Sequence, residues 1–203
     1  MIGVDLDNTI VCYDELFGRV ALEEGLVPAG TALTKTAIRD HLRSVGGEDR
    51  WTALQGTIYG PRMADASSFP GVTEFFAACR AAGVPLAIVS HRTRFPYLGE
   101  RHDLHAAARD WIARRGFHAV DGLDLPPDRV YLEDTKEKKL VRIAAIGCTH
   151  FIDDLPEMLT HPLFPPAVSR ILFDPQRSHG RLEGVATVFS WADAARLILE
   201  DAP

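Results

Sequence analysis

From about residue 69 onward, short apolar runs alternate with segments that have the spacing of amphipathic helices. Residues 85–90 are representative: six mostly apolar residues bounded by turn signals, as expected for a strand that is buried on both faces. The same pattern predicts further strands at residues 2–4, 129–132, 149–152, 170–173 and 185–189, and helices at 72–82, 105–115, 136–146 and 191–199. This alternation predicts an α/β fold, a Rossmann-like, doubly wound parallel sheet.

Residues 14–68 interrupt the alternation. Their spacing predicts helices at about residues 15–22, 34–45 and 49–57, the second one capped by Thr34, and no convincing strand. We therefore expect an α/β core formed by residues 1–13 and 69–203, with residues 14–68 as a small helical insertion. An insertion that leaves a sheet directly after its first strand is expected to cover the crevice at the strand ends as a cap.

Two carboxylates, Asp5 and Asp7, follow the apolar run Ile2-Gly3-Val4. Ligands of open α/β sheets bind in the crevice at the carboxyl ends of the strands. If the strand stops at Asp5 and the chain then turns, both carboxylates face that crevice. The pair then indicates a cation site, a nucleophile beside a general acid, or both. By itself, the same pattern also fits a turn that an aspartate side chain caps.

Other chemically useful groups follow later predicted strands or begin a helix. They are Ser90, a lysine within residues 136–139, and the pair Asp153-Asp154. Taken singly, each has an ordinary structural explanation: a hydroxyl bonded to backbone, a solvated helix face, or a helix cap. Strand ends of a parallel sheet converge, however, so these groups are expected to meet the first carboxylate pair. Carboxylates, a hydroxyl and an ammonium in one place suit phosphoryl chemistry with Mg²⁺.

In this order the motifs resemble those of the haloacid dehalogenase superfamily, specifically its phosphatase branch. The resemblance covers residues 1–13 and about 69–157. The D-x-D-x-T motif is matched by residues 5–9, the strand that ends in Ser or Thr by Ile88-Val89-Ser90, and the acidic pair after a strand by Ile152-Asp153-Asp154. The lysine motif has several candidates. The helical insertion is similar to the caps that this superfamily carries between its first and second motifs.

The resemblance implies a catalytic role for each matched residue. Asp5 is expected to attack phosphorus and form an aspartyl-phosphate. Asp7 is expected to protonate the leaving oxygen and then to activate the hydrolytic water. Ser90 would hold phosphoryl oxygens, and a lysine would neutralise the developing charge. The presence of Asp7 favours a phosphate-ester hydrolase over a dehalogenase, because a halide leaving group needs no proton.

The catalytic lysine is either Lys139 or Lys136. The resemblance favours Lys139, which lies about two helical turns before Gly147, where the helix is expected to stop. Lys136 remains the alternative if the helix starts earlier, and Lys138 is expected to point elsewhere. For Mg²⁺, the resemblance implies ligands from Asp5, Asp154 and the backbone carbonyl of Asp7. Asp153 would act as a secondary acid.

Four residues are expected to contact substrate: Asn8 and Thr9 in the first motif, and His91 and Arg92 in a basic loop after the second. The loop would contact an anionic or sugar-like leaving group, although it also fits an ordinary surface loop. Some insertion residues are further candidates for the pocket, each with a bland structural alternative: Arg50, Trp51, Tyr59 and Arg62.

The function that the sequence favours is a Mg²⁺-dependent phosphatase acting on a small phosphorylated metabolite. A phosphomutase or other phosphotransferase with the same aspartyl-phosphate is one alternative, and a non-catalytic binding module is another. The net charge of −6 argues against nucleic acid or an anionic membrane as the partner. Three cysteines without C-x-x-C spacing, and no recognisable leader, predict a cytoplasmic protein. The sequence leaves open which ester is hydrolysed and the oligomeric state.

Overall fold

The structure is a computed structural model that describes residues 1–200 of the chain. Its centre is a six-stranded sheet in the order β5-β4-β1-β6-β7-β8, and every neighbouring pair is parallel. This confirms the predicted doubly wound α/β fold. The strands are β1 (Ile2–Val4), β4 (Leu86–His91), β5 (Val130–Glu133), β6 (His150–Asp153), β7 (Ser169–Phe173) and β8 (Val185–Val188).

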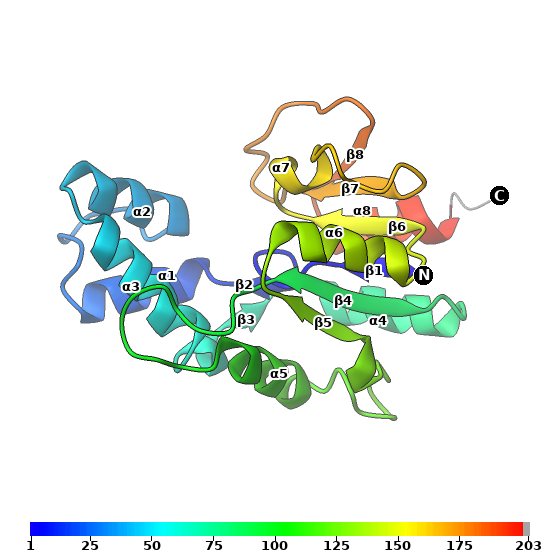
Figure 1. Cartoon of the computed structure of the whole chain (residues 1–203), viewed down its shortest axis with the longest axis horizontal. Coiled ribbons are helices and arrows are strands. Elements are labelled where there is room, and N and C mark those ends of the chain that lie inside the picture. The colour runs from blue at the N-terminus through cyan, green and yellow to red at the C-terminus, as the bar shows by residue number, and fades with distance from the viewer. Residues whose placement is uncertain (201–203) are drawn as a thin grey trace.

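Helices cover both faces of the sheet (Figure 1). α4 and α8 lie together on one face, and α6 packs on β4 and β5 from the other. The rings of Phe76 and Phe117 lie 5.1 Å apart and join α4 to the chain that follows α5. The helices of this core are α4 (Val72–Ala81), α5 (Leu104–Arg114), α6 (Lys136–Ala145), α7 (Pro156–Leu159) and α8 (Trp191–Ala195), which continues as a π-helical turn (Arg196–Glu200).

The apolar residues of the strands divide between two cores because strand side chains alternate between faces. Val4 and Ile88 belong to the core beneath α4 and α8, whereas Val89 and Phe151 belong to the core beneath α6. Gly3 faces this second core. A Cβ atom there would lie 2.6 Å from the Phe151 ring, so the central strand needs glycine to sit this close to β6.

Three helices lie to one side of the sheet, beyond the carboxyl ends of its strands: α1 (Asp14–Glu23), α2 (Lys35–Ser44) and α3 (Glu48–Tyr59) (Figure 1). Their apolar side chains are continuous with the core beneath α4 and α8, and among them the rings of Phe17 and Trp51 stack at 5.2 Å. As the sequence predicts, Thr34 caps α2 by accepting a hydrogen bond from the Ala37 backbone N–H at 3.2 Å.

Differences from the sequence-based assignment are small. β2 (Val11–Cys12) and β3 (Ser67–Ser68) form an antiparallel pair where the chain leaves and re-enters the core, and these strands are too short to produce a periodic pattern. Short 3-10 turns also occur at Met63–Asp65 and Pro127–Arg129. Within residues 1–200, the helices are too short or too polar to cross a membrane.

The packing of α4 on α8 supports a stability prediction. Phe75 is 1% exposed and its ring lies 4.9 Å from that of Trp191. Phe75→Ala leaves a cavity between the two helices and is expected to lower the free energy of unfolding by about 3–5 kcal/mol. Val141→Ala, at a site on α6 that is 68% exposed, is the control and is expected to change it by less than about 0.5 kcal/mol. Urea denaturation measures both, and equal effects would contradict this packing.

Candidate active site

A tight turn after β1 presents the first carboxylate pair. The backbone N–H of Asp5 donates to the Ile152 carbonyl at 2.9 Å, which fixes Asp5 beside the end of β6. The chain then reverses: the backbone N–H groups of Ile10 and Val11 both donate to the Leu6 carbonyl, at 3.1 and 2.9 Å. Asn8, at the tip, has φ of 58°, a left-handed conformation that Asn tolerates better than most residues.

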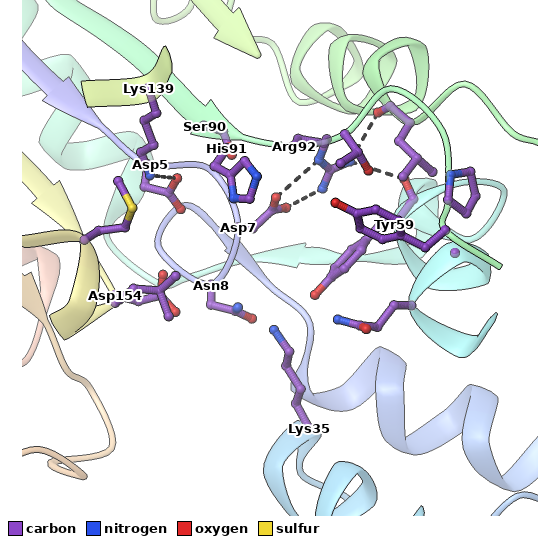
Figure 2. A pocket seen from close by; sticks show the side chains of 18 of the residues that line it. Asp5, Asp7, Asn8, Lys35, Tyr59, Ser90, His91, Arg92, Lys139 and Asp154 are labelled. Carbon is purple, nitrogen blue, oxygen red and sulfur yellow. Dashed lines mark hydrogen bonds and ion pairs between the residues drawn. The ribbon is translucent and has the colours of Figure 1, made fainter. Parts of the chain in front are cut away.

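A cavity of 310 Å³ opens between the ends of the strands and α3 (Figure 2). The strand ends form one wall of the cavity, α3 forms the second, and the chain at and after the end of β4 forms the third. α3 packs closely on this third wall at Gly56, where a Cβ atom would lie 2.9 Å from the Pro96 side chain. The core contributes Asp5, Asp7, Asn8, Ser90, Lys139, Asp154, Leu155 and Met158; the helices before residue 60 contribute Lys35, Thr52, Gln55, Gly56 and Tyr59; and the third wall contributes residues 91–93, 96, 97 and 104.

Lys139 is the lysine that reaches the acidic groups. Its Nζ donates to Asp5 Oδ1 and to Asp153 Oδ2, both at 2.6 Å, and all three side chains are buried. Despite burial, these two carboxylates raise the pKa of the Lys139 ammonium. The other candidates lie elsewhere: Lys136 forms an ion pair with Glu157 at 3.5 Å and Lys138 with Asp134 at 3.6 Å.

Asp5, Asp153 and Asp154 form an acidic cluster in which one oxygen of each lies within 4.8 Å of the others. Burial, reinforced by Asp153 and Asp7, raises the pKa of Asp5 to about 7, although Lys139 opposes the shift. Burial and the neighbouring carboxylates likewise raise the pKa of Asp154 well above its ordinary value. Lys139 pairs with two of these three carboxylates, those of Asp5 and Asp153. A buried set of oxygen donors with excess negative charge fits a hard divalent cation such as Mg²⁺.

Asp7 is held in a different way from Asp5. Its carboxylate accepts hydrogen bonds from Arg92, through Nε at 3.2 Å and through Nη2, and from the Tyr13 hydroxyl at 2.7 Å. Burial would raise the pKa of Asp7, but Arg92 and Tyr13 outweigh it and lower the pKa below its ordinary value. In this arrangement Asp7 is an ionised proton acceptor. Donation of a proton, as the sequence-based role requires in the first step, needs a separation from Arg92.

Arg92 lines the cavity, but its guanidinium is bound to protein groups. Besides Asp7 and Tyr13, its guanidinium donates to the backbone carbonyls of Tyr59 at 3.2 Å and Leu104 at 3.3 Å. It is 4% exposed, and its Cζ lies 5.2 Å from the Tyr59 ring centre. These contacts give Arg92 a positioning role toward Asp7, and the substrate contact that the sequence suggested for it stays a prediction. It ties Asp7 to the end of α3.

Ser90 and His91 lie where the sequence placed them, at the end of β4 and on the cavity wall. The Ser90 hydroxyl is buried and has no hydrogen-bond partner among the described residues. Burial and nearby Lys139 lower the pKa of His91, which favours its neutral form. Thr9 does not line the cavity. It is buried, and its hydroxyl donates to Asp154 Oδ1 at 3.4 Å, so it supports the acidic cluster.

Of the pocket residues that the sequence suggested in the helical insertion, some line the cavity and others do not. Tyr59 lines the cavity, whereas Trp51 packs on Phe17 and Arg62 forms ion pairs with Glu23 and Asp65. Arg50 is exposed and is not among the lining residues.

Lys35 and Tyr13 were missed by the sequence analysis. Lys35 lines the cavity from the first turn of α2, and Tyr13 binds Asp7 from the start of α1. The only signal for Lys35 was its position directly after the helix cap Thr34, which says nothing about what its side chain faces.

Comparisons with known proteins are informative at the level of the fold. No protein-family profile and no curated protein matches the chain. Among solved structures it is similar to a HAD phosphatase from Thermococcus onnurineus (14% identity, TM-score 0.53, 98% of this chain and 96% of that one). It is also similar to a HAD family hydrolase from Deinococcus radiodurans R1 with bound phosphate and sodium (18% identity, TM-score 0.51, 98% of this chain and 94% of that one). A third similar structure is that of a dehalogenase (13% identity, TM-score 0.55, 97% of this chain and 96% of that one). These likenesses show the fold of HAD-superfamily hydrolases.

The burial of Lys139 leads to a prediction that matched lysines can test. Lys139→Met leaves two buried carboxylates without their shared counter-charge and is expected to lower the free energy of unfolding by about 3–5 kcal/mol. Lys138→Met removes an exposed ion pair from the same helix and is expected to change it by at most about 1 kcal/mol. Guanidinium denaturation compares the two variants, and a Lys139→Met protein as stable as the control would refute the burial of this charge.

Proposed function

We propose that this chain, which has the fold of HAD-superfamily hydrolases, is a Mg²⁺-dependent phosphatase that hydrolyses a small phosphomonoester through an aspartyl-phosphate. The observation that carries the proposal is the acidic cluster at the floor of the cavity. Asp5, Asp153 and Asp154 lie together, Lys139 is paired with only the first two of them, and Asp5 and Asp154 line the cavity. Phosphoryl transfer depends on positioning and on cationic stabilisation of the phosphoryl oxygens, and this arrangement suits both requirements.

In the first step, a carboxylate oxygen of Asp5 attacks phosphorus, and the bond from phosphorus to the ester oxygen breaks. The departing oxygen takes up a proton. Lys139 holds one oxygen of Asp5 at 2.6 Å, which fixes the direction of the nucleophile. The unpartnered Ser90 hydroxyl is available to donate to a phosphoryl oxygen.

Mg²⁺ held by Asp5, Asp154 and the backbone carbonyl of Asp7 would neutralise phosphoryl charge when bound. Asp153 is already occupied: one of its oxygens accepts from Lys139 and the other from the Leu155 backbone N–H at 2.9 Å. Its contribution is therefore to fix Lys139 and the turn that carries Asp154.

In the second step, water attacks the aspartyl-phosphate, which releases inorganic phosphate and regenerates the Asp5 carboxylate. Asp7 accepts the proton of the water. The ionised state that Arg92 and Tyr13 impose on Asp7 suits this role directly. For the first step, Asp7 must first separate from Arg92 and take up a proton, which it then gives to the departing oxygen.

Dehalogenases share the fold, so only the residues of the site can distinguish a phosphate-ester hydrolase from a dehalogenase. Two features support phosphate esters: a buried Ser90 hydroxyl without a hydrogen-bond partner in the described part of the chain, and an acidic cluster whose excess charge suits a divalent cation. Displacement of a halide requires no such cation. We further propose that residues 14–68 act as the cap over the cavity and that the protein works in the cytoplasm on a soluble metabolite.

The nucleophile is tested by an isosteric change. Asp5→Asn keeps the shape of the side chain but removes the attacking carboxylate, and is expected to lower phosphate release from phenyl phosphate at least about 10³-fold. Asp128→Asn, at an exposed position, is the control and keeps the activity. Phosphate release and transfer to an added sugar are measured together, because the second would indicate a phosphotransferase. Full activity of Asp5→Asn would end the aspartyl-phosphate mechanism.

The metal requirement is tested separately. Excess chelator is expected to abolish phosphate release, and added Mg²⁺ to restore it. In Asp154→Asn a ligand loses its charge, so the Mg²⁺ concentration for half-maximal activity is expected to rise at least about tenfold. Asp128→Asn again serves as the control. Activity that survives exhaustive chelation would rule out a metal-dependent reaction.

A further inference from the structure

Three cationic side chains line the cavity, and they differ in what they already bind. Lys139 is committed to Asp5 and Asp153, and Arg92 to Asp7. Lys35 forms no ion pair within 4.0 Å with any carboxylate of the described residues. Its Nζ instead lies over two aromatic rings, 5.6 Å from the centre of Phe17 and 5.7 Å from that of Tyr59. Among these three cations, Lys35 retains hydrogen-bond donors for a ligand.

The backbone of Lys35 is held in place by hydrogen bonds, which fixes the point from which its side chain enters the cavity. Thr34 caps the helix that Lys35 begins, and the Lys35 backbone N–H approaches Asp14 Oδ1 at 3.4 Å. The other oxygen of Asp14 accepts from Gln176 Nε2 at 2.7 Å, which connects this corner of the insertion to the core. The side chain is half-buried and rises between Asp154 and Tyr59 toward Asn8 (Figure 2).

The surroundings keep Lys35 charged. Burial opposes the charged form, but Tyr59 and the carboxylates of Asp154 and Asp7 raise the pKa of Lys35 above its ordinary value. These carboxylates are near enough to attract the ammonium without pairing with it. The other groups on this side of the cavity are neutral and partly apolar: Gln55, Gly56, Tyr59 and Tyr97. A small leaving group with an apolar body and an anionic end matches this wall in shape and in charge.

We propose that Lys35 is a specificity-determining residue that binds a second acidic group, a carboxylate or a phosphate, on the leaving group of the substrate. The inference rests on the proposed phosphatase function and deepens it. It predicts a substrate class: small phosphomonoesters whose alcohol or phenol part carries its own negative charge. In an otherwise acidic crevice, an anionic leaving group needs a cation on the cap side, and Lys35 supplies it.

The test uses two esters that differ only in the second charge: phenyl phosphate, and carboxyphenyl phosphate as its 3- and 4-isomers. The quantity measured is the ratio of kcat/KM for the carboxylated ester to that for phenyl phosphate. Lys35→Met keeps most of the apolar length of the side chain but removes the charge. The ratio for the better isomer is expected to fall roughly tenfold or more. Lys35→Arg is expected to restore most of it.

Lys138→Met, which removes an exposed lysine outside the cavity, is the matched control and is expected to leave the ratio unchanged. Circular dichroism checks that each variant is folded, and Lys35→Gln replaces Lys35→Met if the latter does not fold. An unchanged ratio in the Lys35 variants overturns the assignment of Lys35 but leaves the phosphatase intact. Failure of the unaltered protein to release phosphate from any of these esters with Mg²⁺ overturns the proposed function, and this inference with it.

Discussion

The buried ammonium of Lys139, held between Asp5 and Asp153, is the interaction on which the rest of the site depends. Each of the three groups is costly to remove from water, and the contacts of Lys139 with both carboxylates at 2.6 Å offset much of that cost. The contact joins the ends of β1 and β6 to the first turn of α6. The same three groups that hold these elements together also position the proposed nucleophile, Asp5. The ion pairs of Lys139 therefore contribute both to the stability of the fold and to the proposed reaction.

A second buried cation, Arg92, links the core to the helical insertion. Its guanidinium binds Asp7 and Tyr13 on one side and the Tyr59 carbonyl on the other. The position of α3 is therefore coupled to the position and ionisation of Asp7. In the proposed reaction Asp7 must both donate and accept a proton, and a partner that moves with the insertion provides a physical basis for switching between the two states. Asp5, held by core residues alone, has no comparable freedom.

The cationic side chains that line the cavity differ in what they bind. Lys139 and Arg92 pair with carboxylates of the protein itself. Lys35 lies over two aromatic rings and has N–H donors available for a ligand. In the proposed reaction, the floor of the cavity, made by the core, provides the groups for phosphoryl transfer. The opposite wall, made by α2 and α3, would distinguish one leaving group from another. Under this proposal, substitutions in the insertion would alter which ester is hydrolysed, and substitutions in the core would alter whether any ester is hydrolysed.

The sequence by itself determined the alternation of strands and helices, the helical interruption at residues 14–68 and the order of the polar groups at the strand ends, because periodicity and turn residues are local signals. The resemblance to the haloacid dehalogenase superfamily favoured Lys139, through its distance from Gly147. What Arg92 and Thr9 bind, and that Lys35 reaches the cavity at all, was decided only by the tertiary structure. Burial and ion pairing arise between segments far apart along the chain: Arg92 meets Asp7 across 85 positions, and no local pattern records such a contact.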